Sequence, residues 1–250
     1  MHRMILLGVG TGLPDVDREN THMVFAHPGG LLLVDAGGSV YQRLLRAGLD
    51  PIDLRAVVLT HSHTDHIGGF VPLLFHLRLR AYDRELVVYA HEATIVIVQA
   101  LMAAAGLDNY AAQVRFVPVV AGDDVPIEAD FRLRTALTAH SRPCMALRFE
   151  LATGRALTYS ADTEPCAAVQ ALAQGSDVLI HEATTAAPFD GHTTPAQAGE
   201  VAAAAGVGRL ILVHFSPRWT MPVADALVAI RAGGFHGVAE IGREFQVVTL

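Results

Sequence analysis

Short apolar runs rich in valine, leucine and isoleucine recur along the whole chain, separated by alanine-rich stretches and by glycine or proline. Runs of this length that end at turn-forming residues are typical of buried strands. The pattern predicts eleven strands, at Met4–Val9, Leu31–Val34, Ala56–Thr60, Glu85–Tyr89, Gln113–Val117, Arg132–Ala139, Cys144–Leu151, Ala156–Ser160, Val178–His181, Arg209–Val213 and Gln246–Leu250.

Helix signals lie between several of these strands. Ser39 followed three positions later by Gln42 predicts a capping box, and Gly48 before Asp50-Pro51 predicts the end of that helix. Thr194-Pro195 with Gln197 predicts a second helix that stops at Gly206. The alternation indicates an α/β (α+β) fold, and the 250 residues are expected to form a single domain, or two tightly fused halves.

Polar side chains follow one of these strands in an unusual cluster. The sequence VVLTHSHTDHIGG places His61, His63, Asp65 and His66 directly after the run Ala56–Thr60. Imidazole nitrogen and carboxylate oxygen are common ligands of zinc and related metals. The end of a buried strand is a rigid place to hold them, so the cluster predicts a metal site.

Further chemically active residues end other apolar runs. His140 closes LRTALTAH, Asp162 follows ALTYS, His181 and Glu182 follow DVLI, and His214 follows RLILV. A single histidine at a strand end is usually structural. Several such ends together favour one site, because strand ends of an α/β sheet commonly meet where ligands bind.

Composition indicates whether the protein enters a membrane and where in the cell it is expected to act. The chain is 52% hydrophobic with a mean hydropathy of +0.36, and its longest central stretch without charge is Ala93–Leu107. That stretch is shorter than the ~20 residues of a membrane-spanning helix, and the apolar run at the N-terminus is too brief for a signal peptide. We therefore expect a cytoplasmic protein that does not enter a membrane.

Charge and cysteine content exclude other classes. The net charge is −7 and no lysine is present, which disfavours a protein that holds nucleic acid through a broad basic face. Cys144 and Cys166 form neither a disulfide framework nor a metal-binding pair, and both are expected to be ordinary thiols.

The motifs together resemble a known family. HSHTDH with His140, Asp162 and His214 resembles the signature of the metallo-β-lactamase superfamily of dinuclear metallohydrolases. The segments LGVGTGLP, LLLVDAGG, YSADT, HEATT, GHTTPAQA and LILVHFSPRW resemble its ribonuclease Z branch, which trims the 3′ ends of tRNA precursors.

The resemblance implies a four-layer αββα sandwich, a homodimer and two divalent metal ions, zinc being expected and manganese or iron possible. One ion would bind His61, His63 and His140, the other Asp65, His66 and His214, and Asp162 would bridge both. Asp35 is expected to orient a ligand or to pin a loop, and not to bind metal itself. The expected reaction is hydrolysis of a phosphodiester by a metal-bridging hydroxide. Asp65 would also accept a proton from the attacking water, and His192, held by Glu182, would protonate the leaving oxygen.

Four features depart from the ribonuclease Z pattern. Asp162 follows His140 by 22 positions, which leaves room for a strand pair and a turn but no tRNA-binding arm. Ala161 replaces the usual glycine, Thr193 the usual serine, and His22 stands where a small hydroxyl residue is expected. The expected substrate is therefore a small phosphodiester or an RNA 3′ end, with weak tRNA binding at best.

Two other functions remain open at this point. An arylsulfatase-like or lactonase-like hydrolase would use the same metal ligands, and the compact spacing suits a small substrate. A metal-stabilised binding protein without chemistry is disfavoured, because none of the seven expected ligands is missing. His192 could also be a polar loop residue before a helix. The histidines without partner spacing are expected to be structural or exposed: His2, His27, His76, His91 and His236.

Overall fold

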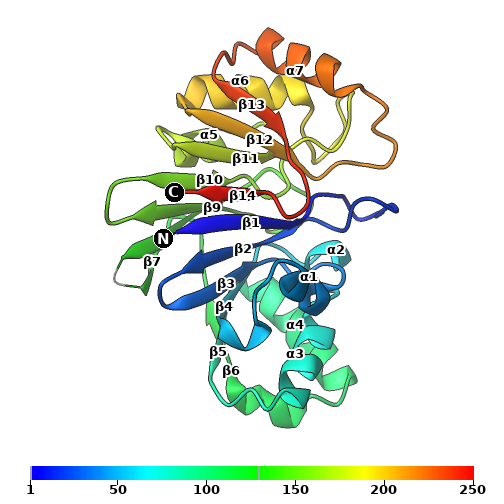
Figure 1. Cartoon of the computed structure of the whole chain (residues 1–250), viewed down its shortest axis with the longest axis vertical. Helices are drawn as coiled ribbons and strands as arrows, with labels where there is room; N and C mark the ends of the chain where they lie inside the picture. The colour runs from blue at the N-terminus through cyan, green and yellow to red at the C-terminus, as the bar shows by residue number, and fades with distance from the viewer. Residues whose placement is uncertain (1, 129) are drawn as a thin grey trace. The chain divides into compact units, whose positions relative to one another are not determined.

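A computed structural model describes residues 2–128 and 130–250, which divide into two compact units (Figure 1). The first unit contains the residues up to Val119 together with Glu244–Thr249, and the second contains residues 120–243 and Leu250. Each unit has its own sheet and its own helices. That the whole chain forms a single domain stays a prediction.

The first unit is built on a seven-stranded mixed sheet in the order β14-β1-β2-β3-β4-β5-β6. The pairs from β14 to β3 are antiparallel, and the pairs from β3 to β6 are parallel. The strands are β1 (Arg3–Gly8), β2 (His22–His27), β3 (Gly30–Val34), β4 (Leu54–Leu59), β5 (Leu86–Ala90), β6 (Val114–Pro118) and β14 (Val247–Thr249).

Helices cover one face of this sheet (Figure 1). They are α1 (Val40–Arg46), α2 (Thr64–Ile67), α3 (Phe70–Leu79) and α4 (Glu92–Ala104), with short 3-10 helices at Pro51–Asp53 and Asp108–Gln113. Alternate strand residues such as Leu33, Val57 and Val88 pack with Leu44 and Leu74 of the helices in one apolar core. Burial of this apolar face is the main stabilising contribution to the unit.

The C-terminal strand β14 forms the outer edge of the first sheet, where it pairs with β1 (Figure 1). The buried Arg43 of α1 fixes this edge. Its guanidinium donates to the Leu7 carbonyl, forms an ion pair with Glu244 and lies 4.4 Å from the centre of the Phe245 ring. A buried arginine with partners on several sides is stabilising, because its charge and its donors are all compensated.

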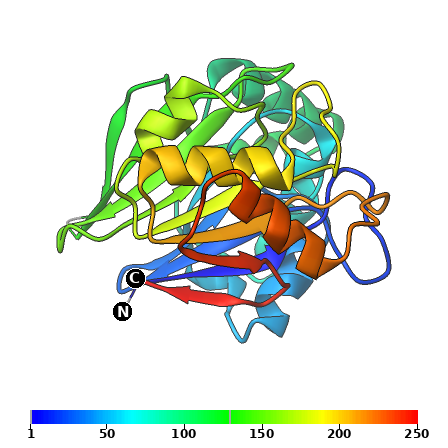
Figure 2. The same ribbon diagram turned by 90° about the horizontal axis from the view of Figure 1, so that it is seen from above.

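The second unit has a seven-stranded mixed sheet in the order β13-β12-β11-β10-β9-β8-β7. The pairs from β7 to β10 are antiparallel and those from β10 to β13 are parallel. Helices α5, α6 and α7 lie side by side on one face of it (Figures 1 and 2). The elements are β7 (Asp124–Glu128), β8 (Phe131–Leu137), β9 (Met145–Leu151), β10 (Ala156–Tyr159), α5 (Ala167–Ala173), β11 (Val178–Glu182), α6 (Pro195–Ala205), β12 (Arg209–Val213), α7 (Val223–Ala232) and β13 (Val238–Ile241).

The predicted α/β class is confirmed, and each of the eleven predicted strands overlaps an observed one. Three strands were missed: β2, β7 and β13. The helix from Thr194 begins with the predicted capping box and ends at Gly206 in the left-handed conformation. The capping box predicted at Ser39 is wrong, since the Ser39 hydroxyl instead donates to Glu19 Oε1 over 2.6 Å.

No helix among the described residues is both long enough and apolar enough to cross a bilayer.

Candidate metal centre

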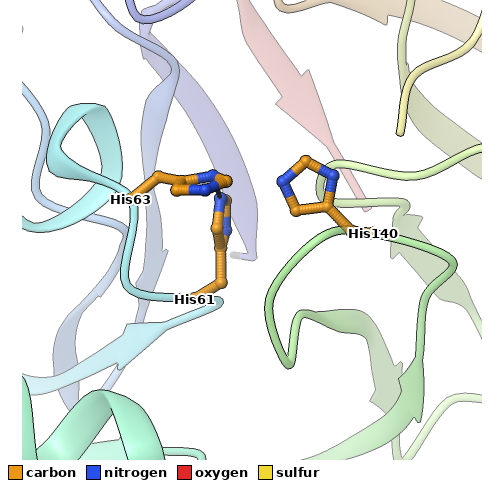
Figure 3. Close-up of side chains that lie close together, drawn as sticks. All are labelled: His61, His63 and His140. Atoms are coloured by element: carbon orange, nitrogen blue, oxygen red, sulfur yellow. Dashed lines mark hydrogen bonds between the residues drawn. The ribbon is translucent and has the colours of Figure 1, made fainter. Parts of the chain in front are cut away.

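The first set of predicted ligands lies just beyond the carboxyl end of β4. His61 and His63 stand in the connecting loop, while Asp65 and His66 belong to the short helix α2 (Figure 3 draws the two loop histidines). His61 Nε2 lies 3.0 Å from His63 Nδ1, and His66 Nε2 lies 3.4 Å from Asp65 Oδ2. Two nitrogens on one tetrahedral zinc, with bonds of ~2.0–2.1 Å, stand about 3.3 Å apart. The spacing of the His61 and His63 nitrogens therefore suits a shared metal ion.

Asp35, which follows β3, contacts one of these histidines directly and another through Thr60. Its Oδ2 accepts from His66 Nδ1 over 2.8 Å, and its carboxylate also accepts from the Thr60 hydroxyl and, over 2.7 Å, from the Thr60 amide. Thr60 Oγ1 in turn lies 3.1 Å from His61 Nδ1. Burial raises the pKa of the Asp35 carboxyl, and its bonds with His66 and Thr60 oppose that rise. Asp35 thus orients His66 directly and His61 through Thr60, the role expected from the sequence.

Close packing of glycine backbone sets the position of α2. A Cβ built on Gly37 would lie 2.1 Å from the Asp65 carbonyl oxygen, and one on Gly69 would lie 2.3 Å from the Gly38 carbonyl oxygen. Real Cβ atoms do not approach so closely, so both positions require glycine. A Cβ on Gly12, in the LGVGTGLP segment, would lie 3.2 Å from Asp65 Oδ2. The glycines of these motifs therefore let the chain approach Asp65 and its helix.

The second set of predicted residues lies at strand ends of the second sheet. His140 follows β8 (Figure 3), Asp162 follows β10, Glu182 ends β11 and His214 follows β12. Asp162 Oδ2 lies 3.4 Å from His214 Nε2 and 4.0 Å from His140 Nε2. Asp162 is buried and faces both histidines, which is the geometry that a carboxylate shared by two ions needs.

His192 lies in the same group of residues, on the loop before α6. His140, Asp162 and His192 each offer a ligand atom within 4.8 Å of the others, and Glu182, His192 and His214 do the same. His192 Nδ1 lies 2.9 Å from Glu182 Oε1, and the fully buried Glu182 also accepts from the Thr163 amide. A carboxylate can only accept, so Nδ1 of His192 carries the proton.

The loop that carries His192 is held at Gly191. Its carbonyl lies 2.9 Å from His140 Nδ1, and its amide donates to Glu164 Oε1 over 2.7 Å. The Thr193 hydroxyl donates to the Thr163 carbonyl, so threonine retains a hydroxyl bond at the position where the sequence departs from serine. The tie at Gly191 fixes the ring orientation of His140 and anchors the loop that bears His192.

Three residues that follow strands near the predicted ligands have left-handed backbone conformations. The φ angles are +59° at Asp35, +50° at Ala161 and +63° at His214. A non-glycine residue in this region costs on the order of 1–3 kcal/mol, and such strain is common at functional sites. The conformation at Ala161 explains why glycine is usual there. Asp35 and His214 adopt this strained conformation directly after β3 and β12. Their side chains contact His66 and Thr184, respectively.

Two buried histidines outside the predicted ligand sets are held neutral. Burial lowers the pKa of His22, which replaces the expected small hydroxyl residue on β2, to about 4. Burial also lowers the pKa of His181, whose Nδ1 lies 2.8 Å from the Glu182 carbonyl. Their Nε2 atoms are buried without a hydrogen-bond partner among the described residues. Each therefore makes protonation of the folded chain unfavourable.

The hydrogen bonds fit the predicted metal ligands. In four of the histidines Nδ1 contacts an oxygen: Thr60 Oγ1 for His61, Asp35 Oδ2 for His66, the Gly191 carbonyl for His140 and Thr184 Oγ1 for His214. A histidine ligand that donates its other ring N–H to an oxygen is the usual arrangement in metal proteins, since it fixes the tautomer and the ring orientation. The two ligand sets therefore have the donors and the supporting bonds that divalent ions need.

Comparison with known proteins agrees with this chemistry. Residues 31–215 match the β-lactamase superfamily domain. The chain belongs to the metallo-β-lactamase superfamily. A ribonuclease Z of Mycobacterium marinum is 30% identical over 99% of this chain and 98% of its own length, and one of Methanothermobacter thermautotrophicus is 28% identical over 88% of each. The metallo-β-lactamase fold protein YhfI of Bacillus subtilis superposes with a TM-score of 0.87 at 24% identity, covering 99% of this chain and 98% of that one.

Membership of the superfamily confirms the predicted fold, and the ribonuclease Z relatives confirm the prediction of a metal-dependent hydrolase. The segment between His140 and Asp162 is fully described. It holds β9, a short turn and β10, which form an antiparallel hairpin. No additional element lies within this described segment, as its length predicted.

Thr60, Thr184 and Glu164 were not predicted from the sequence. Thr60 and Thr184 each donate a hydroxyl and an amide to a carboxylate and contact a histidine, and Glu164 accepts the Gly191 amide. A threonine after a strand or an exposed glutamate gives no signal that separates it from an ordinary loop residue.

Proposed function

We propose that the chain is a dinuclear metal-dependent phosphodiesterase of ribonuclease Z-like type, acting on a small phosphodiester or an RNA 3′ end. The observation that carries the proposal is the hydrogen bond between His192 and Glu182 beside side chains that could hold a metal ion. The similarity to ribonucleases Z over nearly the full length of the chain supports it.

In this proposal the two ligand sets act together. One ion would be held by His61, His63 and His140, the other by Asp65, His66 and His214, and Asp162 would serve both. Two divalent ions supply an activated water molecule and stabilise the charge that develops on the phosphoryl oxygens. Zinc is the expected metal, because histidine nitrogen with carboxylate oxygen is a common zinc ligand set.

The chain's own residues handle the protons. Asp65 accepts a proton from the attacking water. His192 carries its Nδ1 proton toward Glu182, so in its protonated form the Nε2 proton is the one given to the leaving oxygen. The imidazole of His192 stacks with the rings of Phe189 and His214, with centroids 5.9 and 5.6 Å away, which further restricts its orientation.

The hairpin between His140 and Asp162 favours a small or single-stranded substrate over an intact tRNA. We propose that the protein is a homodimer, as the resemblance implies, and that it is cytoplasmic, as its composition indicates. The alternative is a different ester, such as an aryl sulfate or a lactone, which the same metal ligands could hydrolyse.

A substrate panel on metal-reconstituted protein tests the proposal. Phosphodiesters, an RNA with a 3′ extension, aryl sulfates and lactones would be compared at equal metal loading, with a chelator-treated sample as control. The proposal expects chelator-sensitive cleavage of phosphodiesters that exceeds that of the other esters. Preferential turnover of a sulfate or a lactone would overturn it and favour the alternative.

A further inference from the structure

The hydroxyl of Thr184 contacts three chemically important side chains of the second unit. Thr184 Oγ1 lies 2.6 Å from Glu182 Oε2, 2.8 Å from His214 Nδ1 and 3.1 Å from His192 Nδ1. The Thr184 amide also donates to Glu182 Oε2 over 3.1 Å. Thr184 is buried, and so are Glu182 and His214. Nothing in the metal-ligand pattern of the sequence assigns a role to this threonine.

Counting protons defines the direction of these bonds. The hydroxyl has a single proton, and a carboxylate can only accept, so the proton of the short Thr184–Glu182 bond comes from Thr184. Thr184 Oγ1 is then an acceptor for His214, which makes Nδ1 of His214 the protonated nitrogen. Nε2 of His214 keeps its lone pair on the side of Asp162. One carboxylate therefore fixes the tautomers of His192, directly, and of His214, through Thr184.

The first unit contains the same arrangement on unrelated strands. There the Asp35 carboxylate contacts His66 directly and accepts from the hydroxyl and the amide of Thr60, whose Oγ1 contacts His61. In the second unit Glu182, Thr184 and the two histidines make the corresponding contacts. The recurrence of a carboxylate and a threonine serving two imidazoles shows that the contacts of Thr184 follow a pattern and are not an isolated crowding of side chains.

We propose that Thr184 is a positioning residue that couples metal binding at His214 to proton donation by His192. This inference rests on the proposed function. Through Thr184, the Glu182 carboxylate holds the His214 ring ready for a metal ion, and the same carboxylate holds His192. Loss of the hydroxyl removes the acceptor of the His214 N–H and a donor to Glu182, so both histidines lose orientation together.

The test uses Thr184→Val, which keeps the side-chain shape without the hydroxyl, and Thr184→Ser, which keeps the hydroxyl. Thr185→Val is the matched control, because Thr185 is only partly buried and its hydroxyl donates to the Ala187 carbonyl, away from Glu182 and the two histidines. Nitrogen NMR of the histidine rings in metal-free protein reports the tautomer of His214. Competition with a zinc chelator reports affinity, and the ratio of rates on an alkyl and a nitrophenyl phosphodiester reports proton donation.

We expect wild type, Thr184→Ser and Thr185→Val to show His214 protonated at Nδ1. Thr184→Val should show a mixed tautomer, about 10–100-fold weaker zinc binding and a larger loss of rate on the alkyl substrate than on the nitrophenyl one. Nε2 protonation of His214 in wild type would overturn the inference before any variant is needed. So would a Thr184→Ser variant that behaves like Thr184→Val, since that would indicate a structural role.

The tautomer and the zinc affinity require no substrate, so they separate this inference from the proposed function. Absence of phosphodiesterase activity with an intact Thr184 effect on the tautomer would overturn the function only. If Thr184→Val does not fold, the tautomer of wild-type His214 and the rescue by Thr184→Ser still decide the inference.

Discussion

Nδ1 of His66 lies 2.8 Å from Oδ2 of Asp35, and both side chains are buried. Asp35 is in a left-handed backbone conformation that an aspartate adopts only at a cost. The bond fixes which nitrogen of His66 remains available to a metal ion. We therefore expect Asp35 to influence metal binding through His66.

Asp35→Ala should weaken metal binding by about 10–100-fold, because His66 loses the acceptor that sets its tautomer and Thr60 loses the acceptor of its hydroxyl. Chelator competition measures the affinity. Asp177→Ala is a suitable control, since the Asp177 carboxylate also accepts a backbone amide and a side-chain donor but lies at the surface. Equal metal affinity in the two variants would show that Asp35 does not orient a ligand.

His192→Ala should reduce cleavage of RNA-like or alkyl phosphodiesters by about 10²–10⁴-fold, because a ribose alkoxide needs a proton to leave. Nitrophenolate leaves without such help, so the rate on a bis-nitrophenyl phosphate should largely persist. Steady-state rates on both substrates, at equal measured metal content, check the prediction. A similar loss on both would assign His192 to positioning or to metal retention, and no loss on either would make it a loop histidine.

Binding of a 3′-extended tRNA should be weak, micromolar or poorer, and should fall steeply with salt. The net charge of −7 disfavours a broad basic surface, and the segment between His140 and Asp162 holds a short hairpin in place of an arm. Fluorescence titration at several salt concentrations is the measurement. Tight binding at physiological salt with accurate 3′ cleavage would show that the arm is dispensable.

The metal-free protein should lose stability as the pH falls below about 6.5, the ordinary pKa of histidine. Burial lowers the pKa of His181 in the folded chain, so the unfolded chain binds the additional proton. The free energy of unfolding then decreases by up to about 1.4 kcal/mol per pH unit for this one group. Denaturant unfolding at a series of pH values should give a shallower slope for His181→Leu than for wild type. Identical slopes would contradict a depressed pKa at His181.

The sequence was informative where function depends on strand ends. Apolar runs located the strands, and polar residues directly after them marked both ligand sets, because such side chains are unusual next to buried β-structure. In two of the three missed strands, polar residues or proline interrupt or flank the apolar run. β7 contains two acidic residues and a proline, and β2 begins and ends with histidine.

Other features depend on contacts between distant residues. Ser39 was predicted to cap its helix, yet its hydroxyl donates a hydrogen bond to Glu19, which lies twenty positions earlier. Thr60 and Thr184 act through a single hydroxyl each, and local sequence does not show which side chain will face that hydroxyl. Thr60 and Thr184 are therefore identified only once the strands are in place, whereas Asp35 and Glu182 were predicted because they lie at strand ends.

Metal stoichiometry coupled to activity tests the central claim most directly. Metal-free protein would be titrated with zinc, and in parallel with manganese and iron, while bound metal is measured by elemental analysis and phosphodiester hydrolysis is followed. The account predicts close to two ions per chain, with activity lost to chelators and restored by metal. It also predicts that Asp162→Ala retains fewer ions and little activity, because Asp162 faces both His140 and His214. A chain that binds no metal, or hydrolysis that chelators leave unchanged, would contradict it.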